Sequence, residues 1–599
     1  MRLALVSMPW AIFNRPSIQL GALKSYICSR DQTIDAATYH PYLGVARAIG
    51  FDTYRIISED SWAGEALYCA ILFPEMKDQA RSVFHSSLGK TTANLLPDFD
   101  LLCKQLDTHF ASWLDTNDFS STNLVGFSVC FGQLPATLFA ARHLKKKYPL
   151  IQIVLGGSTC VPKIGTSLLQ VFPEIDFIIA GEGEQPLLEL CQHLQGKAPG
   201  LSPVVLTRED KNIHQNHPST ILPGNEIQDL NTLPIPDYDD YFTELKQSGS
   251  EFIPQIPLEF SRGCWWNKCT FCNLNLQWCG YRFKNSHRMQ NEVELIVKKY
   301  NCLDVAFTDN ALPPAEADCF FTAMQSNEKD IRFFAEIRST NKPDQYSHYR
   351  QGGLNSVQIG IEAFSNSLLK RMNKGVTIMD NMAAMKHCAA AGIQLDGNLI
   401  LEFPGSSEQE AQETLRVLEF TLPYRPLAGA IFFLGHGSPV WNEPSKYGVR
   451  SIRHHPYNRK LYPESILTRL DLLIKQGSGD RKHQKTIWRP VRKKIMEWAT
   501  FHKNRNNKNP ALSYRDGGDF IIIRQEHPGK PTQHHRLTGM SRKIYLACKN
   551  PVSIKTLLHD FNSVTEKVLT VFLKDLENKK LIFQDRDLCL ALAVHRPMY

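Results

Sequence analysis

The sequence predicts an α/β protein in which a doubly wound sheet domain is followed by a partial (β/α)6 barrel and a small winged-helix-like unit. From residue 1 to about 200, short apolar runs typical of strands alternate with helical patterns, and a second alternation runs from Pro257 to about Leu434. From Met540 onward, three helical stretches precede two short strands. At 599 residues the chain is too long for a single hydrophobic core. One domain per roughly 150 residues suggests three or four units.

The composition is that of an ordinary globular protein, with 43% hydrophobic residues, 21% charged residues and a mean hydropathy of −0.28. The net charge of +8 is spread over the chain. Its densest part, Arg489, Arg492, Lys493 and Lys494, is interpreted as a solvated helix face, so we expect no nucleic-acid partner. No apolar run is long enough to span a membrane. Fifteen cysteines without a secretion signal indicate reduced thiols and a cytoplasmic protein.

Residues 1–228 are expected to form the first domain, with a Rossmann-like fold. Its helices are expected over 134–147 and 164–171, and its strand candidates read LALVSM, NLVGFSVCF, IQIVLGG and DFIIAGEGE. Strands that are apolar on both faces and separated by helices indicate a doubly wound parallel sheet.

Small and polar residues follow these strands, at the edge where such sheets bind their ligands. They are Ser128, Gly156, Gly157, Ser158, and the run from Gly181 to Glu184 that includes Glu182. Glycine there lets a bulky cofactor approach the backbone, although ordinary turn glycines would give the same pattern.

An ordered linker is expected over 229–250, because DLNTLPIPDYDDYF combines prolines with acidic turn residues. Residues 251–435 then form the predicted partial barrel of the TIM type, with functional residues on the loops after each strand. Its six strand candidates are PLEFSR, LDVAFTD, IRFFAEIR, SVQIGIE, IQLDGNLILEF and AGAIFFL.

Residues 436–539 are rich in Gly, Pro, His and basic residues, and their broken pattern predicts no particular fold. In residues 540–599, helices are expected near 541–548, 553–560 and 564–578, followed by strands KLIFQD and DLCLALAV. That order suggests a winged helix. We expect an exposed strand edge of this unit to accept an extended peptide leader, and a purely stabilising cap is the alternative.

Three cysteines lie within nine residues of the segment SRGCWWNKCTFCNL: Cys264, Cys269 and Cys272. Thiolates are the ligands of iron–sulfur clusters, and three on one loop can hold three irons of a cubane, leaving the fourth iron open. Cys279 could instead complete a four-thiolate zinc site. Inert buried cysteines are disfavoured by the polar neighbours Lys268 and Asn273.

This cysteine segment, the strand-end GIE at 360–362, the phrase LLKRMNKGVT and the later NLILEFPG resemble the radical S-adenosylmethionine (SAM) superfamily. This chain has four residues between the first two cysteines, where the family usually has three. The resemblance implies a [4Fe–4S] cluster, SAM at its open iron, and an electron donor such as flavodoxin or ferredoxin. It also implies SAM contacts by Glu336, Arg338, Glu362 and Asn398, although charged residues at strand ends can also pair for structure alone.

The amino-terminal half narrows the resemblance. VGFSVCFGQLPATLFAARHL, IVLGGSTC and LPIPDYDDYF look like the cobalamin-binding radical SAM enzymes, and more narrowly like those that mature ribosomally made peptides. The likeness extends to residues 54–74, 436–448 and the carboxyl-terminal unit. The Asp-x-His-x-x-Gly signature that supplies a cobalt ligand is absent, so Gln133 or another residue would face the lower side of cobalamin. The cobalamin contacts implied are Ser128, Gln133, Gly156, Gly157, Ser158, Gly181, Glu182 and Glu184.

The resemblance implies a B12-dependent methyltransferase that acts on an unactivated carbon of a precursor peptide. Two alternatives stay open: a radical SAM enzyme that performs another peptide or small-molecule modification without cobalamin, and a non-enzymatic peptide-binding protein with a zinc-stabilised loop. Metal content separates them, since the enzyme would hold about four irons and four sulfides and the binding protein one zinc.

Overall fold

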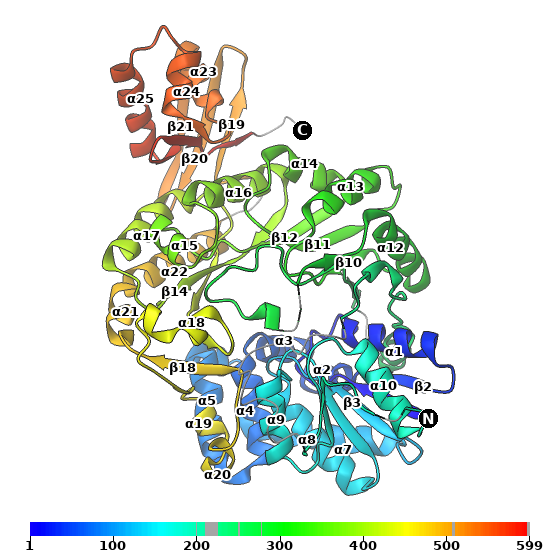
Figure 1. Ribbon diagram of the computed structural model, residues 1–599. Coiled ribbons are helices and arrows are strands. Elements are labelled where there is room, and N and C mark those ends of the chain that lie inside the picture. Colours follow the sequence, from blue (N-terminus) through cyan, green and yellow to red (C-terminus); the bar gives the residue numbers. More distant parts are fainter. Residues whose placement is uncertain are drawn as a thin grey trace.

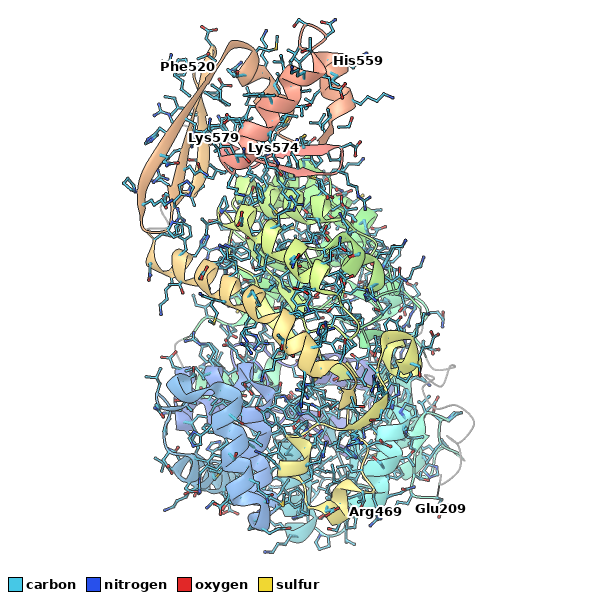
Figure 2. All side chains as sticks on the ribbon, turned by 90° about the vertical axis from the view of Figure 1, so that its left-hand side faces the viewer. Glu209, Arg469, Phe520, His559, Lys574 and Lys579 are labelled. Carbon is cyan, nitrogen blue, oxygen red and sulfur yellow. The ribbon has the colours of Figure 1, made fainter. Side chains whose placement is uncertain are left out.

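The computed structural model describes residues 1–595 apart from 199, 210–225, 250–251, 277, 279 and 506–508. The amino-terminal domain lies below the barrel, and the carboxyl-terminal unit lies on the far side of the barrel (Figure 1). Figure 2 shows the same separation: Phe520, His559, Lys574 and Lys579 mark one end of the molecule, and Glu209 and Arg469 the other. Among the described residues, no helix is long and apolar enough to cross a membrane.

The first domain is built on a sheet with the strand order β2-β1-β3-β4-β5-β6, in which all neighbours are parallel except β6. Helices α1 (Ile18–Arg30) and α10 (Glu184–Leu194) cover one face, and α8 (Leu134–Lys147) and α9 (Pro162–Val171) cover the other. The predicted doubly wound fold is therefore confirmed. Its strands are β1 (Arg2–Val6), β2 (Asp35–Tyr39), β3 (Leu124–Ser128), β4 (Gln152–Gly156), β5 (Phe177–Ile179) and β6 (Val205–Leu206).

Between β2 and β3, the chain forms a helical insertion that the sequence analysis did not identify. Its central helix α4 is buried on nearly every side, so it carries no apolar stripe with helical spacing. The helices are α2 (Pro41–Ile49), α3 (Phe51–Glu59), α4 (Ser61–Leu72), α5 (Lys77–Leu88), α6 (Lys90–Ala93) and α7 (Phe99–Thr116).

The second domain is the predicted partial barrel, and each of the six strand candidates contains a strand. The parallel sheet β13-β12-β11-β10-β7 continues through a bridge between Glu362 and Leu399 into the parallel pair β14-β15. The fifth candidate is divided at Gly397, where a Cβ would lie 2.7 Å from the carbonyl oxygen of Ile359. The strands are β7 (Gln255–Leu258), β10 (Asp304–Phe307), β11 (Arg332–Ile337), β12 (Leu354–Ile359), β13 (Gln394–Asp396), β14 (Asn398–Leu401) and β15 (Ala428–Ile431).

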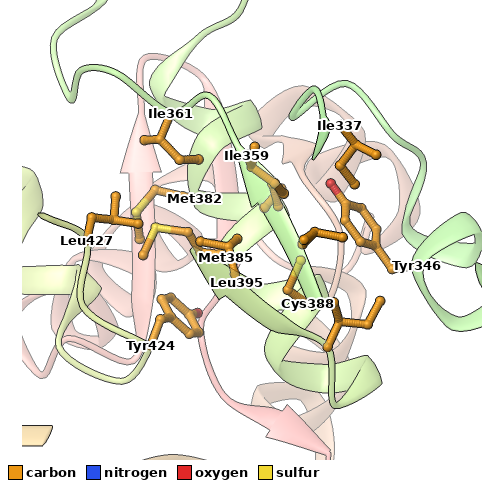
Figure 3. Close-up of a cluster of buried hydrophobic side chains, with 14 of the residues drawn as sticks. Ile337, Tyr346, Ile359, Ile361, Met382, Met385, Cys388, Leu395, Tyr424 and Leu427 are labelled. Carbon is orange, nitrogen blue, oxygen red and sulfur yellow. The ribbon is translucent and has the colours of Figure 1, made fainter. Parts of the chain in front are cut away.

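Helices on the outside of the barrel bury its apolar core. Met382, Met385 and Cys388 of one helix pack with the strand residues Ile359 and Leu395 (Figure 3). This packing fixes the strands, whose carboxyl ends face the amino-terminal domain. The outer helices are α12 (Ser286–Tyr300), α13 (Pro314–Gln325), α14 (Pro343–Gln351), α16 (Ile378–Ala391) and α17 (Glu408–Thr421).

Some elements of the region 436–539 pack on the first domain and others pack on the barrel. Strands β16 (Leu434–Gly435), β18 (Ile474–Ser478) and β17 (Ser451–His454) form an antiparallel sheet. Leu461, Tyr462 and Leu467, which lie on or beside α19 (Asn458–Leu461) and α20 (Glu464–Leu467), belong to the core of the first domain. Helix α22 (Arg489–Asn504) contacts α17 and β15. It carries the basic run, of which Lys493 is exposed as predicted while Arg492 pairs with Glu402.

The carboxyl-terminal unit has the helix–strand–helix–helix–hairpin order expected of a winged helix. Strand β23 of this unit packs on the barrel: the ring of Phe583 lies 5.3 Å from that of Phe420, and the carbonyl of Gln584 faces Arg416 of α17. The expected binding of a peptide leader at a strand edge of the unit stays a prediction. A second sheet, β21-β20-β19-β25, joins the unit to the region before it. The elements are β19 (Leu512–Asp516), β20 (Phe520–His527), β21 (Lys530–Thr538), α23 (Gly539–Ala547), β22 (Val552–Ser553), α24 (Ile554–Asp560), α25 (Glu566–Asn578), β23 (Ile582–Asp585), β24 (Leu588–Ala591) and β25 (Val594–His595).

Candidate active site between the two sheet domains

A cavity of about 310 Å³ separates the carboxyl ends of the amino-terminal strands from the first strands of the barrel. From the barrel, Glu259, Arg262 and Gly263 reach it directly before the cysteine loop. From the first domain it is lined by seven of the eight residues predicted to contact cobalamin: Ser128, Gly156, Gly157, Ser158, Gly181, Glu182 and Glu184.

Two glycines shape the floor of this cavity. Gly181 has a φ of +112°, and a Cβ there would meet no atom within 4 Å, so this backbone borders open space. Gly157 has a φ of +101°, and a Cβ there would lie 2.9 Å from the backbone of Val129. The buried hydroxyl of Ser128 has no hydrogen-bond partner among the described residues. The open space at Gly181 and the unsatisfied hydroxyl of Ser128 suit a bulky cofactor with polar substituents.

Gln133 is buried and is absent from the residues that line the cavity, so its predicted place below cobalamin stays a prediction. Its amide nitrogen donates to the carbonyl of Met8, and its oxygen accepts from the backbone N–H of Cys130 at 3.0 Å. The side chain therefore links the loop after β3 to the loop after β1, because it satisfies one backbone group of each.

Glu182 and Glu184 line the cavity, and their carboxylates also bind arginines of the barrel. Arg262 contacts Glu182 at 2.6 Å, Glu184 at 2.5 Å and Glu259 at 2.9 Å, and Arg282 also pairs with Glu182. Burial alone would raise the pKa of Glu184, but the charge and hydrogen bond of Arg262 outweigh it and lower this pKa. These carboxylates join the two domains.

The cysteine loop begins at Arg262, whose strand β8 (Ser261–Arg262) pairs with β9 (Arg282–Phe283). It docks on the segment 371–375 of the LLKRMNKGVT motif. The backbone N–H of Thr270 donates to Met372 at 2.9 Å, and the indole N–H of Trp266 donates to Asn373 at 2.8 Å.

The three cysteines of this loop are partly exposed and form no disulfide. Burial, together with the neighbouring thiols of Cys269 and Cys264, raises the pKa of Cys272 to about 11. No three His, Cys, Asp or Glu side chains of the described part converge on a single ion. Cubane thiolates bind separate irons and need no such convergence. Cys279 lies outside the described residues.

Three of the four residues predicted to contact SAM lie beside this loop. The guanidinium of Arg338 lies 4.7 Å from the ring centre of Trp266, and its Nε has no hydrogen-bond partner among the described residues. Glu362 pairs with Lys374 at 3.2 Å. Burial, together with the charge of Glu362, raises the pKa of Glu336 to about 7. The site thus holds both signs of charge.

Asn398 is the fourth predicted residue. Its side chain is exposed, and its backbone carbonyl accepts from the N–H of Glu362 at 3.0 Å. Sequence reasoning missed Arg262 and Lys374. Arg262 lies two residues before Cys264 and Lys374 lies within LLKRMNKGVT, so a basic residue in each quoted motif was the available signal.

Comparison with known proteins agrees with this geometry. Residues 258–418 match the radical SAM superfamily. An uncharacterized methyltransferase of Pyrococcus horikoshii is 24% identical over 49% of this chain and 63% of its own length. The anaerobic magnesium-protoporphyrin IX monomethyl ester cyclase of Rubrivivax gelatinosus is 25% identical over 48% and 53%. The chain thus matches about half to two thirds of the length of these relatives.

Two solved structures share the fold. OxsB, a cobalamin-dependent SAM radical enzyme with aqua-cobalamin bound, superposes with a TM-score of 0.56 and 14% identity over 85% of this chain and 69% of its own. The radical SAM methyltransferase TsrM from Kitasatospora setae, with cobalamin and a [4Fe–4S] cluster bound, gives 0.53 and 13% over 83% and 90%. The barrel that carries Cys264, Cys269 and Cys272 is a radical SAM domain.

Proposed function

We propose that this chain is a cobalamin-dependent radical SAM methyltransferase that acts on an unactivated carbon of a ribosomally made precursor peptide. The observation that carries the proposal is the cavity between the glycine-lined strand ends and the cysteine loop. Two cofactors held on its two sides would face one substrate carbon, and such placement is the main contribution of the protein to cofactor chemistry.

Within this proposal, Cys264, Cys269 and Cys272 hold the [4Fe–4S] cluster. Arg338 and Lys374 offer positive charge for the carboxylate of SAM, while Glu336 and Glu362 offer negative charge for its cationic groups. When bound, the cluster and SAM supply a radical that takes hydrogen from carbon, and cobalamin supplies the methyl group. The ion pairs of Arg262 keep the two halves of the site in register.

The cobalamin assignment is supported by Gly157, Gly181 and Ser128, and by the folds of OxsB and TsrM. The methyl-transfer assignment is supported by the name of the Pyrococcus relative. The peptide assignment rests on the family resemblance, as do the electron donor, a flavodoxin or ferredoxin, and the cytoplasmic location.

Anaerobic reconstitution with iron, sulfide and hydroxocobalamin tests the proposal. We expect about four irons and four sulfides per chain and one cobalamin. Replacing Cys264, Cys269 and Cys272 with Ala should abolish the brown absorption and reductive SAM cleavage, whereas Cys319→Ala, on the exposed face of α13, should keep both. One zinc in place of iron would favour the non-enzymatic binding protein. A loaded cluster without retained cobalamin would favour a radical SAM enzyme that uses no cobalamin.

A further inference from the structure

A second cleft, of about 520 Å³, lies where the three parts of the chain meet. Trp62 and Phe131 come from the amino-terminal domain, Ile431 and Phe433 from the end of the barrel, and His455 from the region 436–539. The volume is within the range of about 300–1,000 Å³ that ligand sites have.

Aromatic side chains build the wall of this cleft. The rings of Trp62 and His455 stack at 4.6 Å, and Tyr457 meets Trp62 edge-on at 5.4 Å. Burial lowers the pKa of His455 to about 4, so its ring is neutral near pH 7. Three large apolar side chains stay accessible at the cleft: Phe131 is 40% exposed, Ile431 52% and Phe433 54%. Accessible apolar side chains that gather at one cleft indicate a binding site.

The loop after β3 connects this cleft to the cofactor cavity. Cys130 lines the cavity, and the next residue, Phe131, lines the cleft. The amide of Gln133 fixes this loop through the backbone N–H of Cys130. A ligand in the cleft would therefore contact the same loop that borders the cofactor cavity.

A basic pocket of about 510 Å³ adjoins the cleft and shares its residues 476–481. Arg453, Arg459, Arg481 and Lys482 line it, and within the described chain none of the four pairs with a carboxylate. The acidic residue of the pocket, Asp480, is hydrogen-bonded elsewhere: its carboxylate accepts from the backbone N–H of Gly405 at 3.2 Å and from the side-chain amide of Gln484 at 2.6 Å. The pocket thus has uncompensated positive charge.

Strand β17, which carries Arg453, offers main-chain groups as well. In the described part of the chain it pairs with β18 alone, so its outer edge has no strand partner. Such an edge can bind an extended peptide through main-chain hydrogen bonds.

We propose that the cleft and the basic pocket together bind an extended acidic segment of the peptide substrate. An apolar side chain would enter between Phe131 and Phe433, and neighbouring carboxylates would lie over Arg453 and Arg481. The identity of the ligand as substrate rests on the proposed function, and the location of the site rests on the contacts described above.

The test uses full-length reconstituted protein and the fluorescently labelled probe peptide Glu-Glu-Gly-Phe-Gly-Glu-Glu, amidated at its carboxyl end and followed by fluorescence anisotropy. Acidic residues on both sides of Phe make the probe independent of chain direction. We expect Ile431→Ser to weaken binding about tenfold, because an apolar contact is lost, and Arg481→Gln about fivefold. The matched controls Ile522→Ser and Arg515→Gln, at exposed positions of β20 and β19, should leave affinity unchanged.

Binding should also weaken with added salt and fail when Lys replaces Glu in the probe. Equal losses in the Ile431→Ser and Ile522→Ser proteins, or no binding by the unmodified protein, would overturn the proposal. If Ile431→Ser kept peptide affinity but lost cobalamin, the cleft would belong to the cofactor and the proposal would also fail. Peptide binding by protein that retains no cobalamin would contradict the proposed function alone.

Discussion

Replacing Arg262 with Met should destabilise the junction between the two sheet domains. Its side chain is 4% exposed, and the side chains of Glu182 and Glu184, which it binds, are 2% and 6% exposed. Met preserves much of the volume but leaves Glu184 buried without its cation, while Glu182 keeps Arg282. Removing one partner of a buried ion pair costs about 3–5 kcal/mol. The matched variant Arg425→Met breaks a half-exposed pair with Asp396 and should cost less than about 1 kcal/mol.

The stability lost in Arg262→Met should depend on pH, and the burial of Glu184 determines in which direction. In the unmodified protein, Arg262 lowers the pKa of Glu184, so the pair stabilises the fold above the unfolded pKa and is lost as pH falls through the folded value. Without Arg262, burial would raise this pKa, and protonation of Glu184 would then relieve the penalty. The destabilisation should therefore be larger near pH 8 than near pH 5.

Because a chain of several domains does not unfold in one step, hydrogen exchange of the segments 181–186 and 259–264 is the appropriate assay, with thermal unfolding beside it. Arg262→Met should increase exchange in both segments, and adding Glu184→Gln should restore part of the protection. If Arg262→Met exchanged no faster than Arg425→Met in these segments, or lost the same stability at pH 5 and pH 8, this reasoning would be refuted.

Three further outcomes are expected. Gly375→Ala would place a Cβ 2.1 Å from the ring of Trp266 and should lower the iron bound per chain. The control Gly392→Ala has a similar φ of +70° but no atom within 4 Å of its Cβ, so it should leave the iron content unchanged. Equal iron contents in the two variants would contradict the docking of the cysteine loop. Glu336→Gln should raise the Tm near pH 8 and change it little near pH 5, because the raised pKa of about 7 means that the ionised carboxyl opposes folding. A Tm gain at the lower pH only would contradict the raised pKa of Glu336. Deletion of residues 540–599 should lower the Tm or the solubility, because it exposes Phe420 and Tyr424 and removes β25, one of the two strands that pair with β19. An unchanged Tm would leave leader binding as the main role of this unit.

The local pattern of the sequence determined most strands of the two sheet domains and the cysteine loop, but not the helical insertion between β2 and β3. The helix predicted over 134–147 is α8, because its first turn contains Pro135 and its last turn three lysines that suit the carboxyl end of the helix dipole. The spacing of Cys264, Cys269 and Cys272 placed three thiols on one loop without reference to the rest of the fold. Glycines at strand ends likewise indicated the cavity, and Gly181 borders open space there.

Only the tertiary structure decided which groups meet. Glu182 and Glu184 have the same sequence signal whether they face a cofactor or an arginine, and their partner Arg262 lies about eighty residues further along the chain. Residues 461, 462 and 467 joined the core of the first domain although the barrel separates them from it in sequence. The side chain of Gln133 binds the backbone of Cys130 in its own loop and that of Met8 after β1, two groups that the fold brings together from distant parts of the sequence. Periodicity reports whether a side chain is buried, whereas the identity of its neighbour depends on how distant surfaces pack.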